Sequence, residues 1–90
     1  HVETVNDIKP LIKLNRDKLY EICDIILEML KESLTFEVLL QKLFYHYELK
    51  MSIRQHSLVG STVRSYLSYL KNEGKVDVII DDNLILWKTV

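Results

Sequence analysis

The chain contains very few of the residues that cross-link or interrupt a fold: one cysteine (Cys23), one proline and two glycines. A single cysteine excludes an internal disulfide, and its position in a helical apolar pattern predicts a buried, reduced thiol. This favours a reducing compartment, so we expect a cytoplasmic protein. With 48% hydrophobic residues and so little glycine and proline, the composition excludes a disordered linker.

Long apolar runs and a surplus of one charge are also missing. No run approaches the ~18 residues of a membrane-spanning helix, and the sequence opens without a signal-peptide pattern, so we expect no membrane partner. The net charge of −1 argues against a dedicated nucleic-acid-binding domain, which usually carries a basic excess. Positive charge is nevertheless concentrated in residues 47–75, which hold five basic and two acidic side chains. Because the chain does not begin with methionine, we expect it to be a fragment of a longer protein.

What the sequence does contain is three stretches of helical periodicity. The first predicts a helix over residues 16–32, capped by Asn15 and apolar on more than one side. The second predicts a helix over residues 36–47, with Thr35 as its N-cap. The inner face of this second helix is expected to hold Val38, Leu39 and Leu43, with Tyr47 as a further candidate.

The third predicted helix is the longest. Ser52 to Gln55 have the capping-box form, so the helix should begin at Ser52. Gly74 should end it in the left-handed conformation. Gly60 lies inside this helix, where glycine costs about 1 kcal/mol relative to alanine. It either permits a close approach of the second helix or marks a break.

A β-hairpin is expected directly after this helix. Residues 75–80 and 84–89 are rich in β-branched and aromatic side chains, and Asp81-Asp82-Asn83 between them predicts a three-residue turn. The order helix, helix, helix, hairpin predicts an α+β fold, namely a three-helix winged helix-turn-helix with a two-stranded β wing. We expect a single domain over residues 1–90, with residues 1–14 as a lead-in segment.

Several landmarks occur together along the chain. His1 precedes a helix that begins with Arg16, and Leu34-Thr35-Phe36 opens the second helix. Residues 66–76 contain a Leu-x-x-Leu pattern followed by Gly-x-Val. With the spacing between these landmarks, the whole chain resembles the C-terminal winged-helix domain that follows the catalytic domain in some metallo-β-lactamase-fold hydrolases.

The resemblance implies that catalysis belongs to a zinc-dependent domain that precedes this one in the same polypeptide. Residues 1–14 would then be the last residues of that catalytic domain. In that family a Gly-His-Gly segment supplies the last zinc-binding histidine. His1 lies near that place, either as a former ligand or as an unrelated terminal residue, and Val2 follows it. The family's His-x-His-x-Asp-His cluster is absent from this chain. The implied role here is a non-catalytic accessory domain that docks on the catalytic domain and borders its active-site entrance.

The residues themselves predict no catalytic, cofactor or metal site in this chain. Zinc needs three or four converging ligands, and the three histidines, His1, His46 and His56, show no ligand spacing. Zinc is therefore expected only in the parent hydrolase. Nucleophilic catalysis needs a base and an orienting group that act on the nucleophile, and the sequence positions no acid or histidine to serve Ser57, Ser61, Ser65 or Ser68.

The alternative function is that of a winged-helix DNA-binding transcriptional regulator. The second helix of a helix-turn-helix enters the major groove, and the third predicted helix presents hydroxyls and cations along one side. Asp81 and Asp82 at the hairpin turn argue against this role, because phosphates repel carboxylates. The candidate nucleic-acid contacts are Arg54, Ser61, Arg64, Ser65, Ser68, Lys71 and Lys75.

A surplus of apolar residues outside the expected core predicts a docking surface. Trp87 is the expected anchor, since aromatic side chains dominate interface energetics. The occupant is left open: the catalytic domain, another protein assembly, a second copy in a homodimer, or the lead-in segment folded back. The candidate docking residues are Ile8, Leu11, Ile12, Leu14, Leu84, Leu86 and Trp87.

Overall fold

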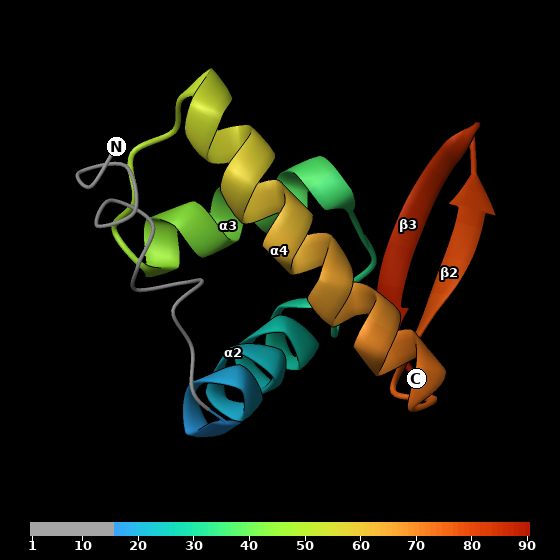
Figure 1. Cartoon of the computed structure of the whole chain (residues 1–90). Helices are drawn as coiled ribbons and strands as arrows, with labels where there is room; N and C mark the ends of the chain where they lie inside the picture. The colour runs from blue at the N-terminus through green and yellow to red at the C-terminus, as the bar shows by residue number, and fades with distance from the viewer. Residues whose placement is uncertain (1–15) are drawn as a thin grey trace.

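The structure, a computed structural model, describes residues 16–90. In this part of the chain, three helices and a three-stranded antiparallel sheet form an α+β fold (Figure 1). The expected cap Asn15 and the lead-in residues Ile8, Leu11, Ile12 and Leu14 lie outside that range. In chain order the elements are α2 (Arg16–Met29), β1 (Leu34–Thr35), α3 (Phe36–His46), α4 (Ile53–Asn72), β2 (Val76–Asp81) and β3 (Leu84–Thr89).

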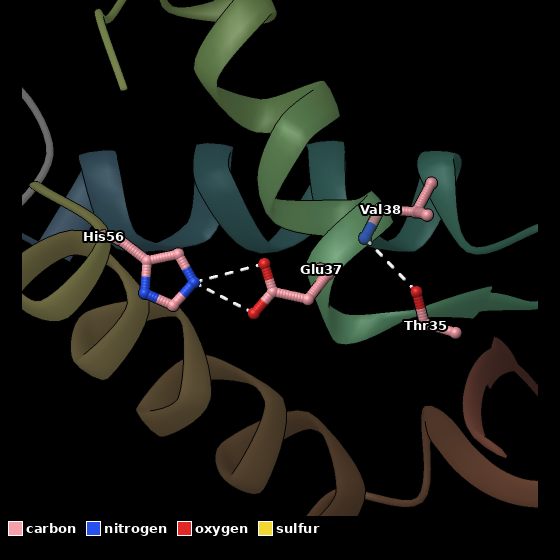
Figure 2. A network of polar contacts seen from close by, with 4 residues as sticks. All are labelled: Thr35, Glu37, Val38 and His56. Carbon is pink, nitrogen blue, oxygen red and sulfur yellow. Dashed lines mark hydrogen bonds and ion pairs between the residues drawn. The ribbon is translucent and has the colours of Figure 1, made fainter. Parts of the chain in front are cut away.

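Local capping chemistry fixes the ends of α3 and α4 where the sequence predicts them. The Thr35 hydroxyl accepts a hydrogen bond from the Val38 N–H at 3.3 Å (Figure 2). The Ser52 hydroxyl accepts one from the Gln55 N–H at 3.1 Å. Gly74 has a φ of 75°, the left-handed conformation that ends a helix, so these three predictions are confirmed.

Helix α2 ends at Met29, three residues earlier than the apolar periodicity predicts. The backbone carbonyl of Leu30 accepts a hydrogen bond from the Thr89 N–H at 2.9 Å. The Thr89 hydroxyl donates to the Leu27 carbonyl at 2.7 Å. These two bonds tie the end of α2 to β3, so the chain leaves the helix there to enter the sheet.

The core lies between the three helices and one face of the sheet. Leu40 and Phe44 are buried on α3 beside the predicted Leu39 and Leu43, whereas Val38 is 37% exposed, so its predicted inward placement is wrong. The apolar face of α3 is therefore rotated away from Val38. The buried core consists of Ile22, Cys23, Ile26, Leu30, Leu34, Leu39, Leu40, Leu43, Phe44, Val59, Val63, Leu67, Leu70 and Val76.

Gly60 lies inside an unbroken α4, so it marks no break in the helix. A Cβ atom at this position would lie 3.6 Å from Phe36 Cζ and 3.7 Å from Leu40 Cδ2. The second helix, α3, does approach Gly60 closely, which confirms the first of the two interpretations of this glycine. The space is nevertheless wide enough for an additional methyl group in ordinary van der Waals contact.

The sheet contains a strand that the sequence analysis missed. Strand order is β1-β3-β2, and β1 pairs with β3 through Leu34 opposite Trp87 and Thr35 opposite Leu86. Two residues are too few to show strand alternation, and Thr35 also serves as the cap of α3. The third strand covers one edge of β3, so β3 is the central strand of the sheet.

The β2–β3 hairpin has a two-residue turn instead of the predicted three-residue turn. Asp81 pairs with Leu84, which leaves Asp82 and Asn83 as the loop. Their φ values of 52° and 60° are both left-handed, the conformation of a type I′ turn. This turn sets the register Val78↔Trp87, and with it the face on which each strand residue lies.

The outer edge of β2 carries a local hydrogen bond. The Val78 N–H donates to Asp77 Oδ1 at 2.8 Å, so the side chain of one strand residue satisfies the backbone of the next. Among the described strands β2 lies at the edge of the sheet, so none of them pairs with this side of it.

Candidate functional site

The polar side of α4 gathers five of the seven predicted nucleic-acid residues. Ser61, Arg64, Ser65, Ser68 and Lys71 recur at helical spacing, and all are exposed. Arg54 lies in the first turn of α4, and Lys75 follows its last residue. A 20-residue helix is about 30 Å long, so these two cations lie at opposite ends of the surface.

Arg64 does not extend freely from this surface. Its guanidinium carbon lies 4.1 Å from the centre of the Phe36 ring, so the cation stacks on the first residue of α3. The Ser65 hydroxyl donates to the Ser61 carbonyl at 3.3 Å, within its own helix. Two of the groups expected to read DNA therefore have partners within the protein.

The structure also joins two residues that the sequence analysis left apart. His56 Nε2, on α4, lies 2.9 and 3.1 Å from the two carboxylate oxygens of Glu37, on α3 (Figure 2). His56 also lines a pocket of about 340 Å³, together with Phe36, Ser57, Gly60, Ser61 and Arg64. The two partners are nineteen positions apart, so no local motif could have indicated the contact.

The remaining groups with catalytic potential lie apart from this pair. His46 ends α3, is exposed, and has its ring edge-on to that of Tyr47 at 4.8 Å. Cys23 is free and buried, and burial, with a smaller contribution from Asp24, raises the pKa of its thiol, which disfavours the nucleophilic thiolate. Within residues 16–90 no three His, Cys, Asp or Glu side chains come together in a way that could hold a metal ion. His1 lies outside that range.

The hairpin exposes apolar side chains on both of its faces. Side chains alternate between the two faces of a strand, so Val76, Val78 and Ile80 face the helices. Val76 is buried, but Ile80 and its partner Ile85, nearer the turn, are 74% and 55% exposed. In Figure 1 the turn of this hairpin points away from the helices.

The opposite, outer face of the hairpin is apolar at its centre and charged at its ends. Ile79 pairs with Leu86 and is 41% exposed, and Leu84 beside the turn is 50% exposed. Of the predicted docking residues, Leu84 is thus exposed and Leu86 half-buried, whereas Trp87 packs against the core. Ile79 and Ile80 were missed, although they extend the apolar surface on the strand that pairs with residues 84–87.

A second apolar surface lies between α3 and the connection of residues 47–52 that follows it. It is a groove of about 560 Å³ with Glu37 and Lys50 among its lining residues. Tyr45, Met51 and Val38 contribute exposed side chains to it. The Tyr47 hydroxyl and Gln55 Oε1 are buried with no hydrogen-bond partner in the described part of the chain. Burial raises the pKa of Tyr47, so its hydroxyl stays neutral.

No helix within the described residues is both long and apolar enough to cross a membrane. Comparison of the chain with known protein families, with curated proteins and with solved structures gave no match. The geometry of the exposed surfaces is therefore the basis for the functional argument.

Proposed function

We propose that this chain is a winged-helix accessory domain without a catalytic site of its own, which docks on the catalytic domain of a metallo-β-lactamase-fold hydrolase beside its active-site entrance. The observation that carries the docking role is the exposure of Ile80 and Ile85 at the turn end of the hairpin. Two paired isoleucines that a monomer leaves in water mark a surface that gains by contact with another apolar surface.

The arrangement of elements supports the winged-helix part of this proposal. Helices α3 and α4 follow one another across the short connection of residues 47–52, and the β2–β3 hairpin follows α4 directly. That is the chain order of a helix-turn-helix with a wing, and β1 adds a short third strand to it. The nature of the partner domain rests on the sequence resemblance alone, as does the zinc of the parent enzyme. The buried, free Cys23 is consistent with a reducing, cytoplasmic location.

The parent domain can be tested from the gene and from the protein. We expect the coding sequence upstream of His1 to contain a His-x-His-x-Asp-His stretch, and the longer product to bind zinc and hydrolyse its substrate. In that product Ile80→Asp should expose the hairpin to hydrogen exchange, whereas Asp82→Ala in the turn should leave it protected. An open reading frame that starts near residue 1 would rule the proposal out.

DNA binding is a second candidate, which the exposed hydroxyls and cations of α4 favour. Stacking of Arg64 on Phe36 and the acidic turn of the hairpin oppose it. A titration with mixed-sequence duplex at about 50 and 200 mM salt distinguishes the two. Micromolar binding that weakens steeply with salt and is lost in Arg64→Ala would support a regulator, and the absence of binding at low salt would exclude it.

A further inference from the structure

A pocket of about 340 Å³ lies between Phe36, the first residue of α3, and residues 56–64 of α4. In the described part of the chain its polar lining consists of a guanidinium, an imidazole and two hydroxyls, and no carboxylate is among the lining groups. These side chains can all donate hydrogen bonds, which is the chemistry that an anion requires. They belong to His56, Ser57, Ser61 and Arg64.

Three of these side chains use none of their donors within residues 16–90. Ser57 and Ser61 lie one turn apart on α4 and are exposed, and neither hydroxyl forms a hydrogen bond in that range. The Arg64 guanidinium stacks on the Phe36 ring at 4.1 Å, a contact that uses the face of the group. Its N–H groups form no hydrogen bond or ion pair with the described residues. Stacking therefore restricts the guanidinium and leaves its donors available to a ligand.

We propose that this pocket binds the phosphate group of a phosphate monoester. The Arg64 guanidinium pairs with two phosphate oxygens at once, and the hydroxyls of Ser57 and Ser61 donate to the oxygens that remain. A monoester offers three terminal oxygens to these three side chains. A phosphodiester within a nucleic-acid strand offers only two, so the pocket fits a monoester better.

The charge around the pocket is compatible with such an anion. Residues 47–75, which supply most of its lining, hold five basic and two acidic side chains. Glu37 is the carboxylate that contacts a lining residue, with its oxygens 2.9 and 3.1 Å from His56 Nε2. Because Glu37 does not line the pocket, it weakens anion binding by repulsion and leaves the site open. Phosphate binding does not depend on the docking role proposed above, because the pocket lies on the helices and the docking residues lie on the hairpin.

Titration of the isotope-labelled 90-residue chain with methyl phosphate, followed by NMR, tests the pocket directly. At about pH 8 this monoester is a dianion, and the ionic strength is held constant so that screening does not change. We expect saturable shifts of the backbone amide signals of residues 56–64. The dissociation constant should be on the order of 1 mM, because three exposed donors only exchange water for phosphate oxygens. Dimethyl phosphate, with two terminal oxygens and a single charge, should bind about fivefold or more weakly.

A matched pair of charge removals on α4 separates the pocket from the rest of the basic surface. Arg64→Gln should weaken methyl phosphate binding about tenfold or more, whereas Lys71→Gln, outside the pocket, should change it less than about twofold. The exposed pair Ser57→Ala and Ser61→Ala, made together, should weaken binding about fivefold. Glu37→Gln should strengthen it, because it removes the repulsive carboxylate. Circular dichroism shows that each variant is folded, and the serine variant carries the test if Arg64→Gln is not.

Three results would overturn the proposal. The first is the absence of saturable shifts up to about 20 mM methyl phosphate, well above the expected dissociation constant. The second is equal weakening by Arg64→Gln and Lys71→Gln, or no weakening in the double serine variant, since either would indicate a general attraction of anions to a basic helix. The third is binding of dimethyl phosphate or mixed-sequence duplex at residues 56–64 as tight as that of methyl phosphate, which would assign the surface to a nucleic-acid backbone.

Discussion

The helical part of the molecule and its β-hairpin use apolar residues in opposite ways. Each of the three helices buries at least three side chains in one core. In the hairpin, Val76 alone of the twelve strand residues is buried, although both strands are as apolar as a core strand. The helices therefore hold the fold together, while much of the hairpin's apolar character contributes nothing to the monomer. Within the described residues, nothing covers the exposed apolar side chains of the hairpin.

The largest effect should come from removing a core side chain from the helical part. Leu67 is 1% exposed and lies on the buried face of α4. Leu67→Ala should lower the free energy of unfolding by about 2–5 kcal/mol, because it removes apolar contacts and leaves a cavity. Chemical denaturation measures this loss. A loss under about 0.5 kcal/mol, the range of ordinary surface changes, would mean that the helices do not carry the stability.

A smaller loss is expected at the start of α4. Ser52→Ala removes the hydroxyl that accepts the Gln55 N–H, so it should cost about 1 kcal/mol. Ser57→Ala, on an exposed turn of the same helix, is the matched control and should change little. Thermal melting of the two variants compares them directly. Equal melting temperatures would show that the cap contributes nothing to stability.

A gain is expected at Gly60. The position has room for a methyl group, at 3.6 Å from Phe36 and 3.7 Å from Leu40. Gly60→Ala should therefore stabilise the protein by about 0.5–1 kcal/mol, since alanine favours the helix interior. Chemical denaturation again provides the measurement. Destabilisation would mean that α3 and α4 pack more tightly here than these distances indicate.

The smallest effects should come from the hairpin. Ile80→Ala and Asp82→Ala lie at its exposed end and should change the free energy of unfolding by less than about 0.5 kcal/mol. Ile80→Ala and Leu67→Ala both truncate a large aliphatic side chain to alanine. Comparing their losses in the free energy of unfolding therefore tests the contrast between the hairpin and the helical core. A loss of several kcal/mol at Ile80 would place the hairpin within the core and remove the reason to expect a partner.

Elements that depend on local chemistry could be predicted from the sequence. Thr35 and Ser52 cap the beginnings of α3 and α4 through hydrogen bonds to residues three positions away, and Gly74 follows the end of α4 in a left-handed conformation. These three helix ends could therefore be predicted from the sequence. The early end of α2 could not be found, because it depends on bonds to Thr89, about sixty residues away in sequence. Strand β1 was missed for the same reason, since only its pairing with β3 defines it.

The candidate surfaces were only partly predictable. The exposed polar side of α4 follows from helical periodicity, but the stacking of Arg64 on Phe36 depends on how two helices pack. The contact between His56 and Glu37 likewise joins separate elements. On the hairpin the sequence showed an excess of apolar residues. Which of them face the core depends on the register, and the two-residue turn at Asp82 and Asn83 sets that register.

The hydrogen bond from the Val78 N–H to Asp77 bears on the tendency of this strand edge to pair with other chains. A β-strand with an open edge and apolar faces is a template on which identical chains can stack into fibres. Here a carboxylate already occupies a donor on that edge, at 2.8 Å, and leaves a negative charge beside it. The apolar faces of the hairpin remain available for contact, whereas the occupied donor and the negative charge disfavour the addition of further strands at the edge of β2. This difference separates specific assembly from aggregation.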